Sequence, residues 1–258
     1  ARAGLNPLRW GRAYVLPEQQ FKQLQQIDEM LGTAASRREV AVAEVMRDPG
    51  PDKFAFGSVF EGSLQIERGD RAYVRYFADE RDQSAILDNV RDAANRCDFV
   101  ILSLHTHEGE AENWYAPRPA SFIEAFSRKA VEAGAHAVVG HGAHMLRGVE
   151  IHKGRPIFYN LSSLLMEFEA GEQLMTPEMY EGFGLKDDPL PSRMHMSRVK
   201  NANGDWIGFY NDRRFERSCY ATLDFDGSRI GIKLVPLDLG MQRTRPAERG
   251  MPAPASPE

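Results

Sequence analysis

Four of the seven histidines in this chain form two close pairs, one near residue 106 and one near residue 142. They are His105, His107, His141 and His144. Each pair follows an apolar run, residues 99–102 or 137–139, of the kind that forms a buried strand. In a parallel α/β sheet, ligands collect where strands end, and neutral imidazole is a common metal ligand. The pattern predicts a metal site at two strand ends, with hydrogen-bonded loop histidines as the alternative interpretation.

The spacing within each pair favours convergence of the imidazoles. His105 and His107 are two residues apart, so both side chains face the same way if the strand continues. His141 and His144 flank Gly142-Ala143, and a tight turn there can direct two imidazoles to one point because glycine relieves backbone crowding. The remaining histidines lack this context and are interpreted as ordinary packed or exposed residues. These are His136, His152 and His195.

Charged residues near the histidines extend the predicted chemistry. Glu108 and Glu110 follow the first pair directly, and a glutamate beside a metal can act as a general base or orient a ligand. We predict His105 and Glu108 as catalytic residues, with a solvated loop face as the alternative for the glutamates. Arg118 and Arg147 flank the histidine loops. Paired N–H donors of arginine suit an anionic substrate, although a surface role is the alternative.

Hydrophobic periodicity predicts an α/β architecture. Helices are expected over 17–35, 79–97 and 119–133. Strands are expected over 63–67, 72–77, 99–104, 135–139, 149–152, 156–160, 217–224 and 230–236. The first two strands should form one hairpin and the last two another, the latter around Asp226-Gly227. Segments without clear periodicity are predicted to be irregular: 1–16, the loop excursions 36–57 and 166–205, and a disordered tail over 241–258.

Composition limits the classes of function. The 258 residues are 42% hydrophobic, enough for a real core, and the net charge of −5 mixes both signs without a basic stripe for nucleic acid. No run approaches the roughly 20 apolar residues of a membrane span. Cys97 and Cys219 are too few for a disulfide framework and are interpreted as buried thiols. The chain begins at Ala1, so we expect a fragment or processed chain, and localisation stays open.

Three central stretches share their order and spacing with one known family. They are Ser103-Leu104-His105, GAHAVVGHGAH at 134–144 and GVEIHKGRPIFYNL at 148–161. Together they resemble the CapA-type family of poly-γ-glutamate capsule synthesis proteins, whose members are often associated with the cell envelope. The expected C-terminal hairpin and the opening residues 2–8 are similar to that family as well.

The resemblance implies a metallophosphatase-like fold, a two-sheet α/β sandwich flanked by helices (αββα), with residues 1–240 as the C-terminal portion of one domain. It implies a centre of two divalent ions, Mn, Zn or Fe, at the strand ends. His105, His141 and His144 match ligand positions, whereas His107 has no firm counterpart. The family's upstream Asp, Asn and His ligands do not occur here, and Leu161-Ser162-Ser163 replaces its Leu-Gly-Asn. Either a separate N-terminal segment completes the site, which we expect, or the site is incomplete and not catalytic.

Several functions fit these expectations. The first is a metal-dependent enzyme that hydrolyses or transfers a peptide or polyglutamate-like substrate. The alternatives are a peptide epimerase with a histidine–carboxylate acid–base pair, and a non-catalytic component that binds an anionic polymer in a synthesis or export complex. A calcineurin-like phosphoesterase is suggested by fold analogy alone. The expected partners are an anionic peptide or polymer and, for a fragment, the N-terminal half or other subunits of a synthesis complex.

Overall fold

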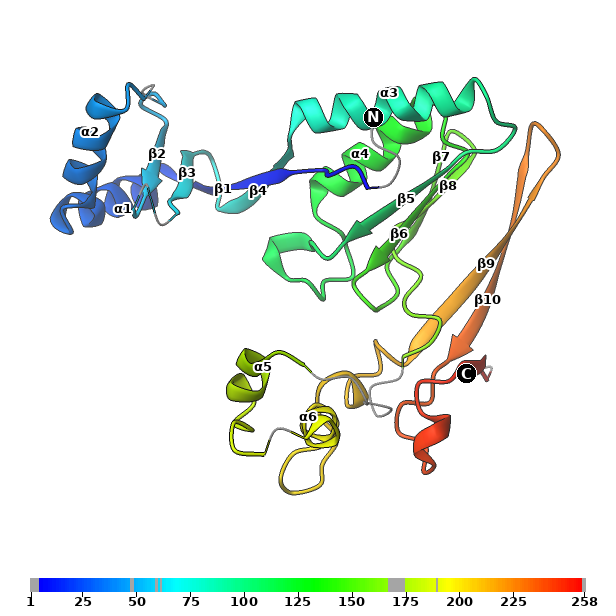
Figure 1. The fold of residues 1–258 in the computed structure, drawn as a ribbon. Helices are drawn as coiled ribbons and strands as arrows, with labels where there is room; N and C mark the ends of the chain where they lie inside the picture. Colours follow the sequence, from blue (N-terminus) through cyan, green and yellow to red (C-terminus); the bar gives the residue numbers. More distant parts are fainter. Residues whose placement is uncertain are drawn as a thin grey trace. The chain divides into compact units, whose positions relative to one another are not determined.

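The chain is a mixed α/β protein that forms two compact units (Figure 1). The computed structural model describes residues 5–46, 49–58, 60, 62–166, 175–188 and 190–256. The N-terminal unit comprises Ala1–Asn89, Glu110–Asn113 and Ala120–Phe126. The histidine unit comprises Val90–Gly109, Trp114–Pro119 and Ser127–Glu258. Helices α3 (Glu80–Ala94) and α4 (Ser121–Glu132) contribute residues to both units, and the assignment of residues 1–240 to one domain stays a prediction.

The N-terminal unit is built on a four-stranded sheet in the order β2-β3-β1-β4. Its strands are β1 (Trp10–Leu16), β2 (Lys53–Phe56), β3 (Leu64–Arg68) and β4 (Tyr73–Ala78). The predicted hairpin of β3 with β4 is wrong, because β1 lies between them, parallel to β3 and antiparallel to β4. Residues 1–16 were also expected to be irregular. β1 forms there instead, and Gly11 inside it makes room for Phe77, whose ring would lie 2.6 Å from an added Cβ.

Two helices pack beside this sheet, α1 (Glu18–Met30) and α2 (Thr33–Ala43). Sequence analysis expected one helix to residue 35 followed by a loop over 36–57. Gly32 breaks the helix instead, with a φ of 76° that favours glycine. The loop prediction is wrong where α2 continues to Ala43 and where β2 forms, and an ion pair between Arg37 and the buried Asp28 ties α2 to α1.

The histidine unit carries a second four-stranded sheet in the order β5-β6-β8-β7. Its strands are β5 (Ile101–Thr106), β6 (Ala137–Gly142), β7 (Val149–His152) and β8 (Arg155–Phe158). β5, β6 and β8 run parallel and β7 pairs antiparallel with β8, so the predicted strand–helix–strand succession is confirmed. β5 was expected to be covered on both faces. It is an edge strand of this sheet instead, and Ile101 on one face is 53% exposed.

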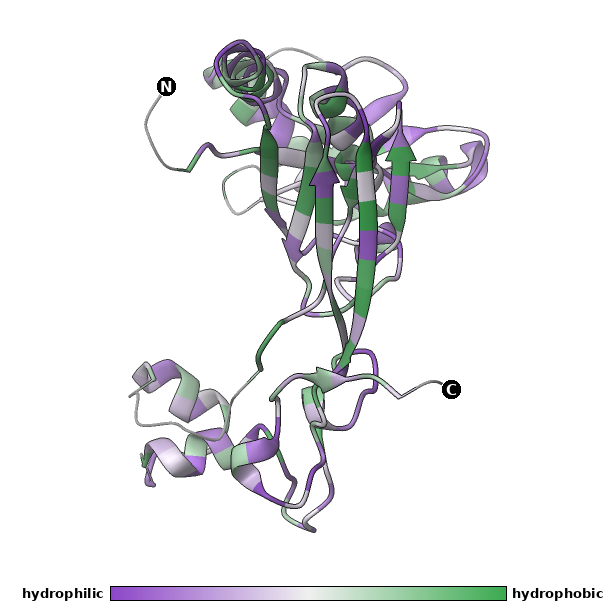
Figure 2. Ribbon diagram, turned by 90° about the vertical axis from the view of Figure 1, so that its right-hand side faces the viewer, coloured by the Kyte–Doolittle hydropathy of each residue, from purple (hydrophilic) through white to green (hydrophobic). Residues whose placement is uncertain are grey.

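A three-stranded sheet completes the strands of this unit, in the order β11-β10-β9. β9 (Arg217–Phe225) and β10 (Ile230–Asp238) form the predicted hairpin, and β11 (Ala253–Pro254) pairs with β10. Figure 2 shows apolar and polar residues alternating along the strands, as expected for sheets with one face packed. Phe225, next to the hairpin turn, packs against Phe99 and His136 at ring distances of 5.0 and 5.1 Å.

Two segments predicted as an excursion and a disordered tail are structured where they are described. The first contains α5 (Pro177–Gly182) and α6 (Pro191–Ser197), and is followed by the short helix η2 (Gly208–Tyr210). The tail contains η3 (Pro246–Glu248) and β11. Met166, Val199 and Met241 share one core cluster with Leu239, and Met241 is only 1% exposed. The segment predicted as an excursion therefore contributes buried side chains to this core cluster. The prediction of a disordered tail is wrong for 241–256. Residues 167–174, 189 and 257–258 lie outside the described residues.

Two smaller predictions concern the cysteines and the membrane. Both cysteines are free, but Cys97 is exposed and Cys219 is only partly buried, so the interpretation of both as buried thiols is wrong. Among the described helices, none combines the length and apolar character needed to cross a bilayer.

Candidate metal centre

The ends of β5 and β6 bring the four histidines together. The register pairs His105 with His141 across the two parallel strands, and their rings are 4.8 Å apart. The Nε2 atoms of His105 and His107 lie 3.1 Å apart, and the ring of His144 lies 6.0 Å from that of His107. The predicted convergence of the two histidine pairs is therefore present in the structure.

Glycines allow β6 to reach this arrangement. An added Cβ on Gly140 would lie 2.2 Å from the carbonyl oxygen of Tyr159, so only glycine fits where β6 passes the end of β8. Gly142 has a φ of 116° and sits against the backbone of Thr106. His144 itself has a φ of 57°, a strained conformation for a non-glycine residue. The turn thus aims His144 back toward the other imidazoles.

Serine hydroxyls contact the outer imidazoles. Ser103 Oγ lies 2.9 Å from Nε2 of His141, and Ser163 Oγ lies 3.1 Å from Nδ1 of His144. Ser162 adopts a φ of 68° and donates from Oγ to the carbonyl of His144 at 3.2 Å. In the sequence, Ser162 and Ser163 stand out only as departures from the family motif. Both contact His144 here, and a ligand's hydrogen-bond partners fix its tautomer and orientation.

Partial desolvation favours the neutral form of three of the four imidazoles. Desolvation lowers the pKa of His107, His141 and His144 below the usual value, and neighbouring imidazoles lower it further. Metal ions bind the neutral form of imidazole, so this environment favours metal binding at neutral pH.

The donor set fits a divalent ion in part. Two ligand nitrogens at about 2.0–2.1 Å from a tetrahedral ion are roughly 3.3 Å apart, close to the 3.1 Å between His105 and His107. However, no group of three or more His, Cys, Asp or Glu side chains among the described residues has an arrangement that could hold an ion. The residues that the structure describes thus supply suitable donors without completing a coordination shell.

The two glutamates of the first histidine loop face the backbone or another element. Glu108 Oε2 accepts from the backbone N–H of its neighbour His107 at 3.0 Å. Glu110 opens the short helix η1 (Glu110–Glu112), which belongs to the N-terminal unit. There Glu112 accepts from the Tyr14 hydroxyl at 2.6 Å and pairs with Arg12. Glu108 lies directly beside the imidazoles in the chain, and its predicted role as general base stays a prediction.

The two predicted substrate-binding arginines differ in environment. Arg118 is exposed. Arg147 is 5% exposed, and its guanidinium donates to the backbone carbonyls of His107, Glu108 and Trp114 at 3.0, 3.0 and 2.8 Å. Burial lowers the pKa of Arg147. Its N–H donors thus hold the histidine loop rather than facing solvent.

An aromatic rim, which sequence analysis missed, borders the histidines. Trp114 contacts His107 edge to face at 5.2 Å, and Phe209 lies 5.8 Å from His144. Tyr115 and Phe215 pack behind them, 5.2 Å apart. Phe209 and Phe215 come from a segment whose proximity depends on the fold, although its density of aromatic residues was a usable signal. The rim offers flat apolar surface beside the imidazoles.

The remaining histidines lie outside the cluster, as expected. His136 accepts from the backbone N–H of Val100 at 3.1 Å, and His152 contacts Glu132. His195 is buried in α6.

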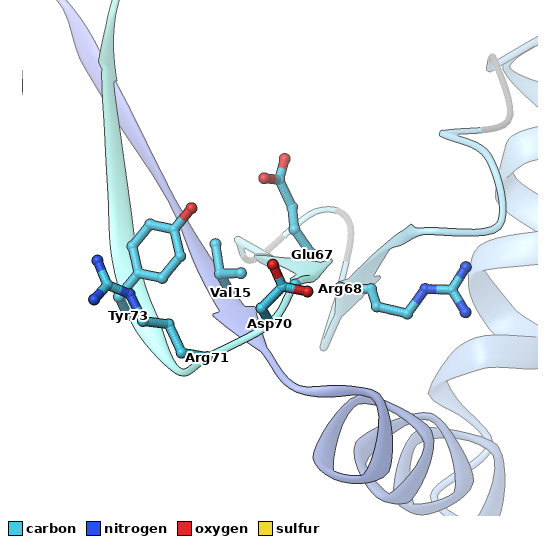
Figure 3. A pocket seen from close by; sticks show the side chains of 7 residues that line it. Val15, Glu67, Arg68, Asp70, Arg71 and Tyr73 are labelled. Atoms are coloured by element: carbon cyan, nitrogen blue, oxygen red, sulfur yellow. The ribbon is translucent and has the colours of Figure 1, made fainter.

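The N-terminal unit holds a separate polar cavity of about 380 Å³ (Figure 3). Its lining comprises Val15, Glu67, Arg68, Gly69, Asp70, Arg71 and Tyr73. Glu67 is paired with Arg75, and Arg68 is paired with Glu18. Because the lining includes neither imidazole nor thiol, the histidine cluster remains the candidate for metal chemistry.

The fold and the strand-end histidines define a protein of the metallophosphatase-like α/β class. Residues 22–167 match the family described as bacterial capsule synthesis protein PGA_cap. That match covers more than half of the chain, and the chain belongs to this family. The recognition made from the sequence is therefore confirmed, and membership connects the chain with capsule or poly-γ-glutamate synthesis.

Several individual proteins are similar to this chain. The uncharacterised protein y4sH of Sinorhizobium fredii is 31% identical over 98% of this chain and 51% of its own length. A probable polyglutamine synthesis accessory protein of Mycobacterium tuberculosis is 29% identical over 43% of the chain and 32% of its own. The capsule biosynthesis protein CapA of Bacillus anthracis is 34% identical over 27% and 16%. The chain thus spans about half the length of the first of these relatives.

Proposed function

We propose that this chain supplies the histidine ligands of a divalent-metal centre that hydrolyses or transfers a peptide or polyglutamate-like substrate in capsule synthesis. The observation that supports this most directly is the approach of His105 and His107 to 3.1 Å between Nε2 atoms, beside His141 on the neighbouring strand. Three neutral histidines can hold one zinc-like ion.

Each residue then has a defined task. His105, His141 and His144, with His107 beside them, would hold the ion or ions, of Mn, Zn or Fe. A bound ion would polarise the substrate carbonyl and acidify a water molecule. Glu108 serves as the base that takes the proton. The exposed Arg118 meets substrate carboxylates.

The remaining ligands come from outside this chain in the proposal. Among the described residues the donors form an incomplete group, and the chain spans about half the length of its relative y4sH. A two-ion centre needs more ligands than three or four imidazoles. The partner is therefore a segment or subunit whose carboxylate and amide oxygens approach the β5–β6 edge.

A second candidate rests on the same shortage of ligands. A non-catalytic component could use the cluster and the exposed arginine to bind an anionic polymer. It requires no complete metal shell, and it predicts polymer binding that does not depend on added metal.

Metal stoichiometry on the purified chain tests the proposal. Wild-type chain freed of metal by chelation should bind Co²⁺, with visible absorption that reports nitrogen ligands. His141→Ala and His144→Ala should each weaken binding about 100-fold, whereas His152→Ala, outside the cluster, should leave it unchanged. A wild-type chain that binds no Co²⁺ contradicts the proposal, and polyglutamate binding by that same chain would support the second candidate.

A further inference from the structure

Arg147 is a buried cation whose guanidinium, within the part of the chain that the structure describes, donates to backbone carbonyls and forms no ion pair. Its guanidinium meets the backbone carbonyl oxygens of His107, Glu108 and Trp114 at 2.8–3.0 Å. Its Nε is also buried and meets no acceptor among the residues that the structure describes. Burying a charge is costly unless its donors are satisfied. The three hydrogen bonds to carbonyl oxygens therefore offset the cost of burying this guanidinium.

Those bonds join the two sides of one loop. His107 and Glu108 lie on the side that leaves β5, and Trp114 lies on the returning side. A bridge between Gly109 and Pro119 closes the base of the same loop. A planar guanidinium spans both sides because its donors point outward in a fixed fork. Arg147 therefore holds the loop at two backbone positions. One is His107, whose ring faces His105, and the other is Trp114, whose ring contacts His107.

Arg147 also connects this loop to the second histidine turn. It lies three residues after His144, and its backbone N–H donates to the carbonyl of Asn160 at 3.0 Å. Asn160 is buried, and its side chain accepts from the backbone of Ser162 at 2.9 Å. One residue thus links both histidine loops and the serine turn beneath His144.

We propose that Arg147 is a positioning residue of the candidate metal centre, which fixes His107 against His105 and Trp114 against His107, rather than a substrate-binding residue. This inference rests on the proposed function for its effect on the ion. The holding of the loop stands on the hydrogen bonds alone. Arg147, which was predicted from the sequence to bind substrate, is thereby assigned to positioning the histidine loop.

The variant Arg147→Lys separates charge from geometry. Lysine keeps the positive charge, but its compact ammonium cannot span carbonyls on both sides of the loop. Amide hydrogen exchange over residues 107–115 should become at least about tenfold faster. Co²⁺ affinity should fall about 10- to 100-fold, the usual effect of removing a group that orients a ligand. Arg96→Lys, at an exposed arginine paired with Asp92, is the matched control and should change neither.

A double-mutant cycle distinguishes positioning from general destabilisation. If Arg147 acts through His107, Arg147→Lys should weaken Co²⁺ binding no further in a His107→Ala background. Additive losses, or unchanged exchange in Arg147→Lys, would overturn the proposal. Arg147→Gln serves as the second variant if the lysine variant is less folded by circular dichroism. A wild-type chain without Co²⁺ binding would sink the proposed function, and exchange alone would then decide whether Arg147 holds the loop.

Discussion

The N-terminal unit and the surroundings of the candidate metal centre differ in how charged and polar side chains are paired. In the N-terminal unit, arginines meet carboxylates: Arg37 meets Asp28, Arg75 meets Glu67, and Arg9 meets Asp82. Around the candidate metal centre, the buried Arg147 donates to backbone carbonyls, and the imidazoles contact each other and serine hydroxyls. The first arrangement satisfies opposite charges within the fold, while the second leaves nitrogen donors facing a common point.

This difference indicates where binding of a metal ion can stabilise the folded chain. An ion pair with good geometry is already satisfied, and a ligand would have to break it. Neutral imidazoles lose little on burial, and their mutual contacts are weaker than a bond to a metal. The histidine unit should therefore respond to metal ions, and the N-terminal unit should respond to the loss of individual ion pairs.

The largest expected effect is on the packing that positions the histidines. Gly140→Ala would place a methyl group 2.2 Å from the Tyr159 carbonyl oxygen. The strand must shift, so we expect a loss of more than about 3 kcal/mol of unfolding free energy, together with loss of Co²⁺ binding. Chemical denaturation followed by circular dichroism measures it. Gly148→Ala is the control, because its Cβ would meet nothing within 4 Å, and equal effects in both variants would contradict the prediction.

The next effect is on the buried ion pair of the N-terminal unit. Arg37→Ala leaves the carboxylate of Asp28, a residue only 2% exposed, without its cation. This should cost about 3 kcal/mol in chemical denaturation with Co²⁺ affinity unchanged. Arg38→Ala removes a pair with the exposed Glu29 and should cost at most about 1 kcal/mol. If Arg37→Ala and Arg38→Ala are equally stable, the buried ion pair does not stabilise this unit more than the exposed one.

A third prediction concerns how the stability of the same unit depends on pH. Arg9 donates to Asp82 from its side chain and its backbone, which lowers the pKa of Asp82 to about 2. The stabilising contribution is full above the unfolded pKa of about 4 and is lost as pH falls toward 2. Wild type should thus exceed Asp82→Asn in stability above about pH 4, and the two should converge near pH 2. A difference independent of pH would exclude this charge as its cause.

The smallest effect concerns the imidazoles without metal. Because burial lowers the pKa of His107, His141 and His144, their ring protons should titrate below about 6.5 in NMR spectra of the metal-free chain. The protonated form then favours the unfolded chain. Stability should fall as pH drops below about 6.5, the unfolded value. Titration at or above 6.5 would show that the cluster is more solvated than described.

Local sequence patterns predicted much of the histidine unit. Apolar runs marked β5, β6 and β8, Asp226-Gly227 marked the C-terminal hairpin, and the histidine spacing marked the strand ends. These succeeded because each depends on residues close in the chain. β1 was missed because its place between β3 and β4 depends on pairing over fifty residues or more, and Gly11 obscured its period. The C-terminal segment was misread because its proline and arginine content hid the buried Met241.

The sequence by itself determined the family, the α/β class and the four histidines as one candidate site. Residue type and short spacing carry that information, since imidazoles at strand ends have few other common roles. Only the tertiary structure decided what surrounds them: serines on His141 and His144, an aromatic rim, and Arg147 beneath the loop. Arg147 donates to backbone carbonyls, which every residue carries. No sequence pattern can therefore mark its partners, and only the folded chain brings them within 3 Å.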